Sequence, residues 1–196
     1  MLNLPCCPLA VCLVLTTALL ARGADPEFQP LFNGRDFTGW RFSLQKVGDP
    51  VPENWKVKDG AISLTGLMRP HLVTTKEFTD FEMKFEWRAL KEKYNSGFYI
   101  RCKPDAGNNQ IRIDKGTEGS FLVGKLDGSK VVPTLQKGFG EWNEWRVLVK
   151  GGSVTLWCNG KLAWEATGLL PERGHIGLQA EGVPMEFRNL QLRELK

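Results

Sequence analysis

Residues 80–101 read DFEMKFEWRALKEKYNSGFYIR and decide the fold. Apolar side chains occupy every second position from Phe81 to Trp87, and charged side chains occupy the alternate positions from Glu82 to Arg88. This period of two is typical of a β-strand that buries one face and exposes the other. Residues 90–95 form a polar connection that ends the strand.

A second strand is predicted at residues 96–102. Phe98, Ile100 and Cys102 share one face of this strand, while Gly97, Tyr99 and Arg101 share the other. Each of the two strands therefore offers an apolar face to a core and a second face that can line a groove. The second face is where we look for function.

The rest of the chain repeats this design. We expect strands at residues 55–57, 61–64, 72–75, 110–114, 121–126, 131–135, 142–149, 154–158, 161–165, 175–180 and 185–192. Glycine turns such as Asp59–Gly60 and Asn159–Gly160 separate them. Many short strands with regular turn signals predict an all-β sandwich or barrel. The expected core includes Phe81, Phe85, Phe98, Ile100, Ile111, Ile113, Ile176 and Leu178.

The first 23 residues are typical of a secretory signal peptide. Leu9 to Leu20 is an apolar run too short for a bilayer span, and Ala21-Arg22-Gly23 places small residues at a cleavage site. We expect a leader at 1–23, a linker at 24–30 and one domain at 31–196 in a secreted or periplasmic protein. A buried N-terminal helix and lipidation at Cys12 are the alternatives. Cys102 and Cys158 remain in the mature chain, as two buried thiols or as a disulfide.

The sequence lacks the residue patterns that several classes of protein function require. The formal charge is +4 without a basic block that carries interleaved aromatics, which excludes a nucleic-acid binder. No glycine-rich stretch precedes a helix, and no Gly-x-Ser-x-Gly or zinc-ligand spacing occurs. An oxygen-ligated divalent cation stays open, because loop carboxylates are available.

Carboxylates are the candidates for chemistry. Glu82 and Glu86 share a strand face, but their backbones are about 13 Å apart at the usual rise per residue. A glycosidase pair needs carboxyl groups roughly 5 to 9.5 Å apart, so these two alone are a poor pair. Solvated sheet surface is the simpler interpretation of both.

A second polar set is more informative. Tyr99, Arg101, Gln110, Arg112 and Asp114 are expected opposite the apolar faces of their strands, and Gln179 and Glu181 opposite the inner face of residues 176–180. Hydrogen-bonding side chains beside an aromatic ring predict a sugar-binding groove, with a plain solvated face as the alternative.

The motifs that carry these residues resemble one family. They are Leu31-Phe32-Asn33-Gly34-Arg35-Asp36 with Gly39-Trp40, Asp80-Phe81-Glu82 to Trp87-Arg88, Asn95-Ser96-Gly97-Phe98 with Arg101, Gly140-Glu141-Trp142-Asn143, Asn159-Gly160, Gly174-His175-Ile176-Gly177-Leu178-Gln179 and Phe187-Arg188-Asn189-Leu190. In this order they are similar to the bacterial 3-keto-disaccharide hydrolase family. The resemblance implies a concanavalin A-like jelly roll of two antiparallel sheets, secretion, and action on 3-keto-glycosides.

The resemblance also implies a mechanism. A ketone at C3 acidifies the C2 proton, a base removes it, the C1 substituent leaves by elimination, and water adds. We expect Asp114 or Glu86 as the base and Arg101, Arg112 or a bound divalent cation as the group that stabilises the enolate. Substrate contacts are expected from Tyr99, Gln110, Arg112, Gln179, Glu181 and Asn95.

Two positions depart from the family. The family usually has Glu-x-Gln-Ile where this chain has Gln110-Ile111-Arg112-Ile113, so an amide replaces a carboxylate and a guanidinium an amide. A non-catalytic glycan-binding module is therefore the competing hypothesis.

Overall fold

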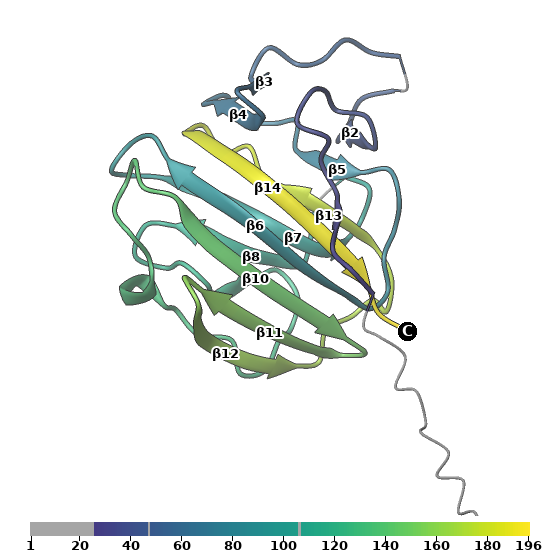
Figure 1. Cartoon of the computed structure of the whole chain (residues 1–196), viewed down its shortest axis with the longest axis vertical. Helices are drawn as coiled ribbons and strands as arrows, with labels where there is room; N and C mark the ends of the chain where they lie inside the picture. The colour runs from purple at the N-terminus through teal and green to yellow at the C-terminus, as the bar shows by residue number, and fades with distance from the viewer. Residues whose placement is uncertain (1–25, 47, 106) are drawn as a thin grey trace, which may run out of the picture.

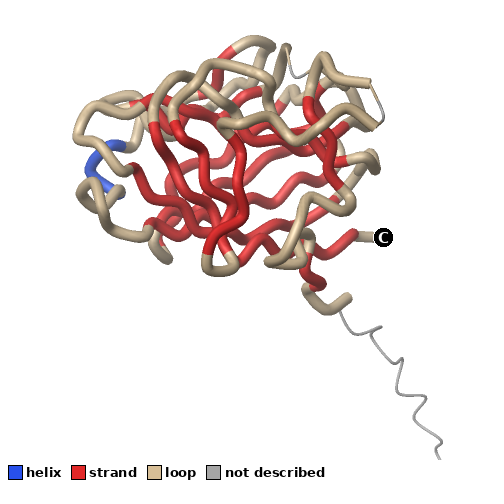
Figure 2. Tube along the Cα trace, turned by 90° about the horizontal axis from the view of Figure 1, so that it is seen from above, coloured by secondary structure: helices blue, strands red, loops and turns tan. Residues whose placement is uncertain are grey.

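The computed structural model describes residues 26–46, 48–105 and 107–196. The expected leader and its cleavage site lie outside the described residues. Two antiparallel β-sheets stack face to face, and the described chain adds one short 3₁₀ helix, η1 (Pro133–Leu135) (Figures 1 and 2). The arrangement confirms the expected all-β, concanavalin A-like jelly roll.

Sheet A contains eight strands. Its order is β12 (Lys161–Thr167), β11 (Ser153–Cys158), β10 (Asn143–Lys150), β6 (Phe81–Ala89), β14 (Pro184–Glu194), β4 (Ala61–Thr65) and β3 (Trp55–Lys58), with β1 (Gln29–Pro30) paired to β14. Residues 29 and 30 fall in the segment that we expected to be a linker, so the sandwich begins two residues earlier than predicted.

Sheet B contains six strands. Its order is β2 (Trp40–Phe42), β5 (Leu72–Thr74), β13 (His175–Leu178), β7 (Asn95–Cys102), β8 (Gln110–Asp114) and β9 (Phe121–Leu122). The expected strand at residues 121–126 is thus only two residues long, and residues 131–135 contain η1 in place of a strand. Proline at position 133 explains the second difference, because it lacks the N–H that a ladder needs.

The two strands that the sequence places side by side, β6 and β7, lie in different sheets. Residues 90–94 carry the chain across the sandwich, so β6 and β7 pack face to face rather than pairing (Figure 1). Their apolar faces meet at Phe85 and Phe98, whose ring centroids are 4.6 Å apart. These two strands therefore link the two layers.

The core fills the space between the sheets. All eight predicted core residues are buried there, each at most 1% exposed. Trp40, Trp55, Trp87, Trp145 and Trp164 join them. Trp142 stays half-buried on the outer face of sheet A, under the guanidinium groups of Arg88 and Arg188.

A β-bulge in β7 overturns two predicted faces. Between Tyr99 and Cys102 the strand advances three residues while its partner β13 advances two, and Arg101 has a φ of 46°. The extra residue shifts the alternation. Cys102 therefore lies with Tyr99 on the outer face, not with Phe98 in the core, and Arg101 is buried.

Two further expectations are settled by burial. Glu82, which we interpreted as solvated, is 1% exposed because Arg146 and Arg193 both bind its carboxylate. Cys102 and Cys158 are buried free thiols, so the disulfide alternative is wrong. Burial raises the pKa of each thiol to about 12.

Candidate functional site

A cleft of about 240 Å³ lies on the outer face of sheet B, the face that carries Tyr99. Its lining includes Arg69, His71, Tyr99, Gln110, Gln179 and Glu181. We call it the sheet B cleft. Four of these residues, Tyr99, Gln110, Gln179 and Glu181, are predicted substrate contacts, and the fold brings them together from β7, β8 and the segment after β13.

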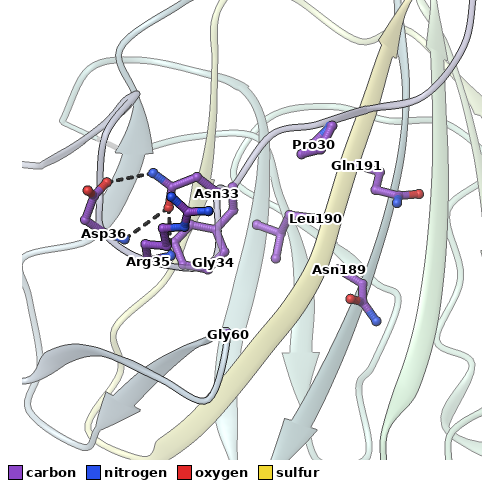
Figure 3. A pocket seen from close by; sticks show the side chains of 10 residues that line it. Pro30, Asn33, Gly34, Arg35, Asp36, Gly60, Asn189, Leu190 and Gln191 are labelled. Carbon is purple, nitrogen blue, oxygen red and sulfur yellow. Dashed lines mark hydrogen bonds between the residues drawn. The ribbon is translucent and has the colours of Figure 1, made fainter.

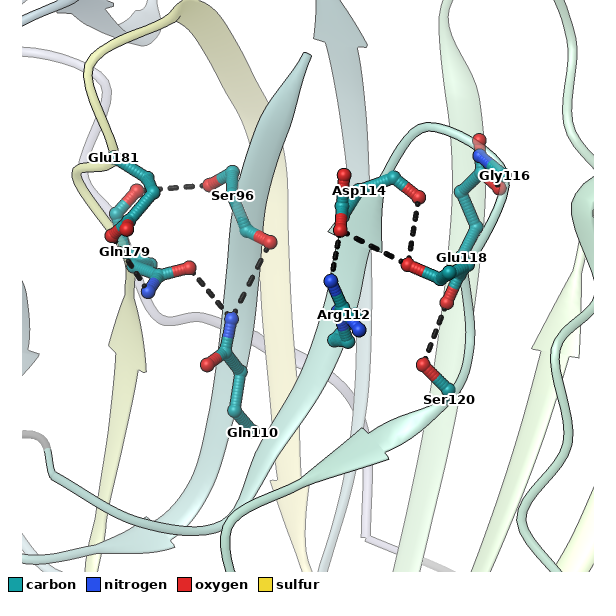
Figure 4. Close-up of polar contacts among 10 residues, drawn as sticks. Ser96, Gln110, Arg112, Asp114, Gly116, Glu118, Ser120, Gln179 and Glu181 are labelled. Atoms are coloured by element: carbon teal, nitrogen blue, oxygen red, sulfur yellow. Dashed lines mark hydrogen bonds and ion pairs between the residues drawn. The ribbon is translucent and has the colours of Figure 1, made fainter.

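A chain of hydrogen bonds runs through three of these residues. Gln110 Nε2 donates to Gln179 Oε1 at 2.6 Å, and Gln179 Nε2 donates to Glu181 Oε2 at 2.9 Å (Figure 4). Glu181 is half-buried, and its other oxygen, Oε1, has no hydrogen-bond partner among the described residues. The site thus contains a carboxylate that is held on one side and available on the other.

His71 is neutral at physiological pH. Burial, assisted by the positive charge of Arg69, lowers the pKa of His71 to about 4. Its Nδ1 accepts a hydrogen bond from the Ala180 backbone N–H at 3.1 Å, so the proton of the neutral ring resides on Nε2. His71 therefore contributes a fixed N–H donor to the cleft.

Tyr99 lies beside His71, with ring centroids 5.5 Å apart. Burial raises the pKa of the Tyr99 phenol far above its ordinary value, and the nearby Cys102 and Glu181 act in the same direction. The hydroxyl therefore stays protonated and can donate a hydrogen bond.

Asp114 and Arg112 lie on the same sheet but are not among the residues that line the cleft. The Arg112 guanidinium binds Asp114 Oδ2 (Figure 4). The Thr117 hydroxyl donates to the same oxygen at 3.0 Å. Asn95 pairs with Asp114 across the β7–β8 ladder. These three predicted site residues form a separate group farther along the two strands.

Arg101 cannot contact a ligand in this cleft. Its side chain is 1% exposed and crosses toward sheet A, where it donates to Thr79 O at 2.8 Å, to Gly151 O at 2.7 Å and to Asp80 Oδ1 at 2.9 Å. The groove face predicted for Arg101 is wrong, because the bulge in β7 turns the side chain inward.

Glu86 lies on the opposite side of the sandwich. It belongs to β6, on the outer face of sheet A, where Arg188 Nε donates to Oε2 at 2.6 Å and Asn189 Nδ2 donates to Oε1 at 3.0 Å. Glu86 and Asp114 therefore cannot serve one active site, since a two-layer core separates them.

A larger cavity, of about 650 Å³, lies between the turn at residues 33–36 and β14 (Figure 3). Its only carboxylate among the described lining residues is Asp36. Hydrogen bonds from Thr38 and Asn33 lower the pKa of Asp36 to about 2, which makes it a weak base. The sheet B cleft is therefore the better candidate for chemistry.

Metal ligands do not gather in the described part of the chain: no group of three or more His, Cys, Asp or Glu side chains there is arranged to hold an ion. No helix in the same part is long and apolar enough to cross a membrane.

The sequence did not indicate Arg69 or His71 as site residues. They belong to a loop that pairs with the segment after β13 through the Met68–Glu181 bridge and the bond from Arg69 N to Ala180 O. This pairing joins segments more than 100 residues apart, and no local sequence pattern predicts it. The sole signal is that His71 is one of two histidines in the chain.

Comparisons with known proteins agree with the fold. The profile of the 3-keto-alpha-glucoside-1,2-lyase-like domain matches residues 27–193. The 3-keto-disaccharide hydrolase of Bacteroides thetaiotaomicron is 25% identical over an alignment of 227 residues that covers 84% of this chain and 77% of that protein.

Two solved structures share the architecture. A candidate glycosyl hydrolase from Parabacteroides distasonis superposes with a TM-score of 0.70 at 23% identity, covering 86% of this chain and 94% of that one. The carbohydrate-binding module CBM66 from Bacillus subtilis gives a TM-score of 0.63 at 13% identity, covering 81% and 98%. At these identities the likeness concerns the fold.

Proposed function

Because the chain belongs to the 3-keto-alpha-glucoside-1,2-lyase-like family, we propose that it cleaves 3-keto-glycosides in the sheet B cleft. One observation carries the proposal: a carboxylate with a free oxygen, Glu181, shares the cleft with two neutral hydrogen-bond donors, His71 and Tyr99. A base and donors for a developing oxyanion are the groups that proton abstraction beside a ketone requires.

The proposed reaction begins at C2 of the sugar. Glu181 Oε1 takes the C2 proton, and the electron pair of the C–H bond forms the enolate with the C3 ketone. The negative charge that develops on O3 is met by the N–H of His71 or the hydroxyl of Tyr99. Both groups are neutral at pH 7 and carry the proton that they donate in this hydrogen bond.

The enolate then expels the C1 substituent. Its electron pair forms the C1–C2 double bond, the C3 ketone is restored, and the glycosidic oxygen leaves with the proton that Glu181 took from C2. Glu181 then takes a proton from the water whose oxygen adds to C1, and it delivers this solvent proton to C2. The sum is hydrolysis of the glycosidic bond, with the ketone unchanged.

The first test is activity. Glu181→Gln keeps the shape of the side chain and the hydrogen bond from Gln179 while removing the base. We expect its kcat on a 3-keto-disaccharide to fall by about 10² to 10⁴, the usual contribution of a general base. Glu86→Gln, on the opposite face of the molecule, is the matched control and should retain activity.

Deuterium labelling tests the route. In D₂O, elimination followed by addition places deuterium at C2 of the product, whereas direct displacement at C1 leaves the original hydrogen. Product incubated without enzyme controls for spontaneous exchange. A wild-type protein that binds the saccharide but neither turns it over nor labels C2 would replace this proposal with the alternative, a glycan-binding module. If Asp114→Asn abolishes turnover while Glu181→Gln does not, the base is Asp114.

We also propose export of the protein to the periplasm or the medium, supported by the apolar run and small-residue cleavage signal in residues 1–23. A 3-keto-glycoside outside the cytoplasm would then reach the cleft directly.

A further inference from the structure

We propose that Gln110 is a positioning residue that fixes the Glu181 carboxylate through the Gln179 amide. The inference rests on the proposed role of Glu181 as base and deepens it.

The direction of the hydrogen bonds follows from the carboxylate. An ionised Glu181 only accepts, so Gln179 must turn its NH₂ group toward it. The Gln179 carbonyl then faces the other way, toward Gln110, and needs a donor there. Gln110 supplies its NH₂ group at 2.6 Å, and the next bond reaches Glu181 at 2.9 Å. A glutamate at position 110 would lack this donor when ionised.

Packing holds the first member of the chain in place. Gln110 is 5% exposed, and its side chain lies across β7 directly above Gly97. A Cβ atom at position 97 would meet Gln110 Nε2 at 2.0 Å. Gln110 Nε2 also contacts Ser96 O at 3.4 Å, and the Ser96 hydroxyl donates to Gln179 O at 2.8 Å. Gly97 is therefore the residue that lets an amide from β8 reach Gln179.

Three charged or titratable side chains line the cleft together with Glu181. Arg69 comes from the loop before β5, His71 from the end of that loop and Tyr99 from β7. His71 and Tyr99 are neutral at pH 7, so Arg69 is the formal positive charge among these three. The hydrogen bond from Gln179 holds one oxygen of the ionised carboxylate in place.

The experiment is a double-mutant cycle on the carboxyl NMR signal of Glu181. The variants are Gln179→Met, Gln110→Met and the double variant, with Gln191→Met on β14 as the control. Carboxyl ¹³C NMR of the ligand-free protein at pH 7 follows the chemical shift of the Glu181 signal, which is assigned by its loss in Glu181→Gln. The constants kcat and KM are measured in parallel.

Gln179→Met should move the Glu181 carboxyl signal, because the carboxylate loses the donor that holds Oε2. Gln110→Met should shift it in the same direction by a smaller amount, and the double variant should match Gln179→Met alone, because Gln110 acts only through Gln179. If Gln110→Met does not fold, Gln110→Asn, which is one methylene shorter, takes its place.

An unchanged Glu181 carboxyl signal in folded Gln110→Met or Gln110→Asn would overturn the proposal, and so would two shifts that simply add. The NMR measurement needs no substrate. A protein that shows the predicted cycle but turns over no 3-keto-glycoside would retain the positioning role and lose the proposed function.

Discussion

Replacing Arg101 by alanine should destabilise the protein rather than weaken saccharide binding. Arg101 is 1% exposed and donates to two backbone carbonyls, Thr79 O and Gly151 O, and to the Asp80 carboxylate. Removing one partner of a buried ion pair costs about 3 to 5 kcal/mol. Asp80 is 30% exposed and keeps a hydrogen bond from Gly151 N at 2.9 Å, which places the expected loss near the lower end, about 3 kcal/mol.

Urea denaturation followed by tryptophan fluorescence measures this loss. With a slope of about 2 kcal/mol per M, a loss of about 3 kcal/mol moves the midpoint down by roughly 1.5 M. Arg173→Ala is the control, because its ion pair with Glu77 is exposed and should contribute less than about 1 kcal/mol. A midpoint for Arg101→Ala within the error of the control would refute the argument from burial. Loss of saccharide affinity in a fully folded Arg101→Ala protein would refute the inward placement.

Three further results are expected. Gly97→Ala should cost about 1 to 3 kcal/mol in unfolding free energy and reduce turnover, because the new methyl group collides with Gln110, whereas Gly138→Ala has open space and should change neither in the same urea and activity assays. The pKa of His71 is lowered from 6.5 to about 4, so the unfolded chain binds the extra proton first; unfolding free energy should fall as pH drops through this window, by up to about 1.4 kcal/mol per unit, and His71→Asn should flatten that slope in urea titrations at pH 4 to 7. Mass spectrometry of the exported protein should find a mature N-terminus near Ala24, and a retained leader would contradict export.

The alternation of apolar and polar residues predicts the faces of a single strand. The period of two in residues 81–88 fixes which side chains of β6 face the core, and the same reasoning applies to β8, whose bounds match the expectation. The pairing of strands is not local. Nothing in residues 80–101 distinguishes two strands of one sheet from two strands that face each other across a core, and the structure has the second arrangement.

The residues of the candidate site could also be predicted only where they follow local alternation. Tyr99 and Gln110 were found because they alternate with Phe98 and Ile111 in regular strands. Arg101 was misplaced by a single extra residue, which the sequence does not mark and which moves every later side chain to the other face. His71 was missed because its loop is held at the cleft by a contact with Ala180, which is more than 100 positions away.

The place of β14 has a consequence for synthesis. Among the strands of sheet A this one comes last in the sequence, yet it lies between β6 and β4 near the middle of the sheet. Until the ribosome has added residues 184–194, the β3–β4 hairpin and the β6–β10 half of the sheet have no neighbour that joins them. The facing edges of β4 and β6 stay open during elongation, when unpaired edges are prone to wrong partners. The charged side chains from Glu82 to Arg88 stand along one of these edges and make it a poor template for another strand.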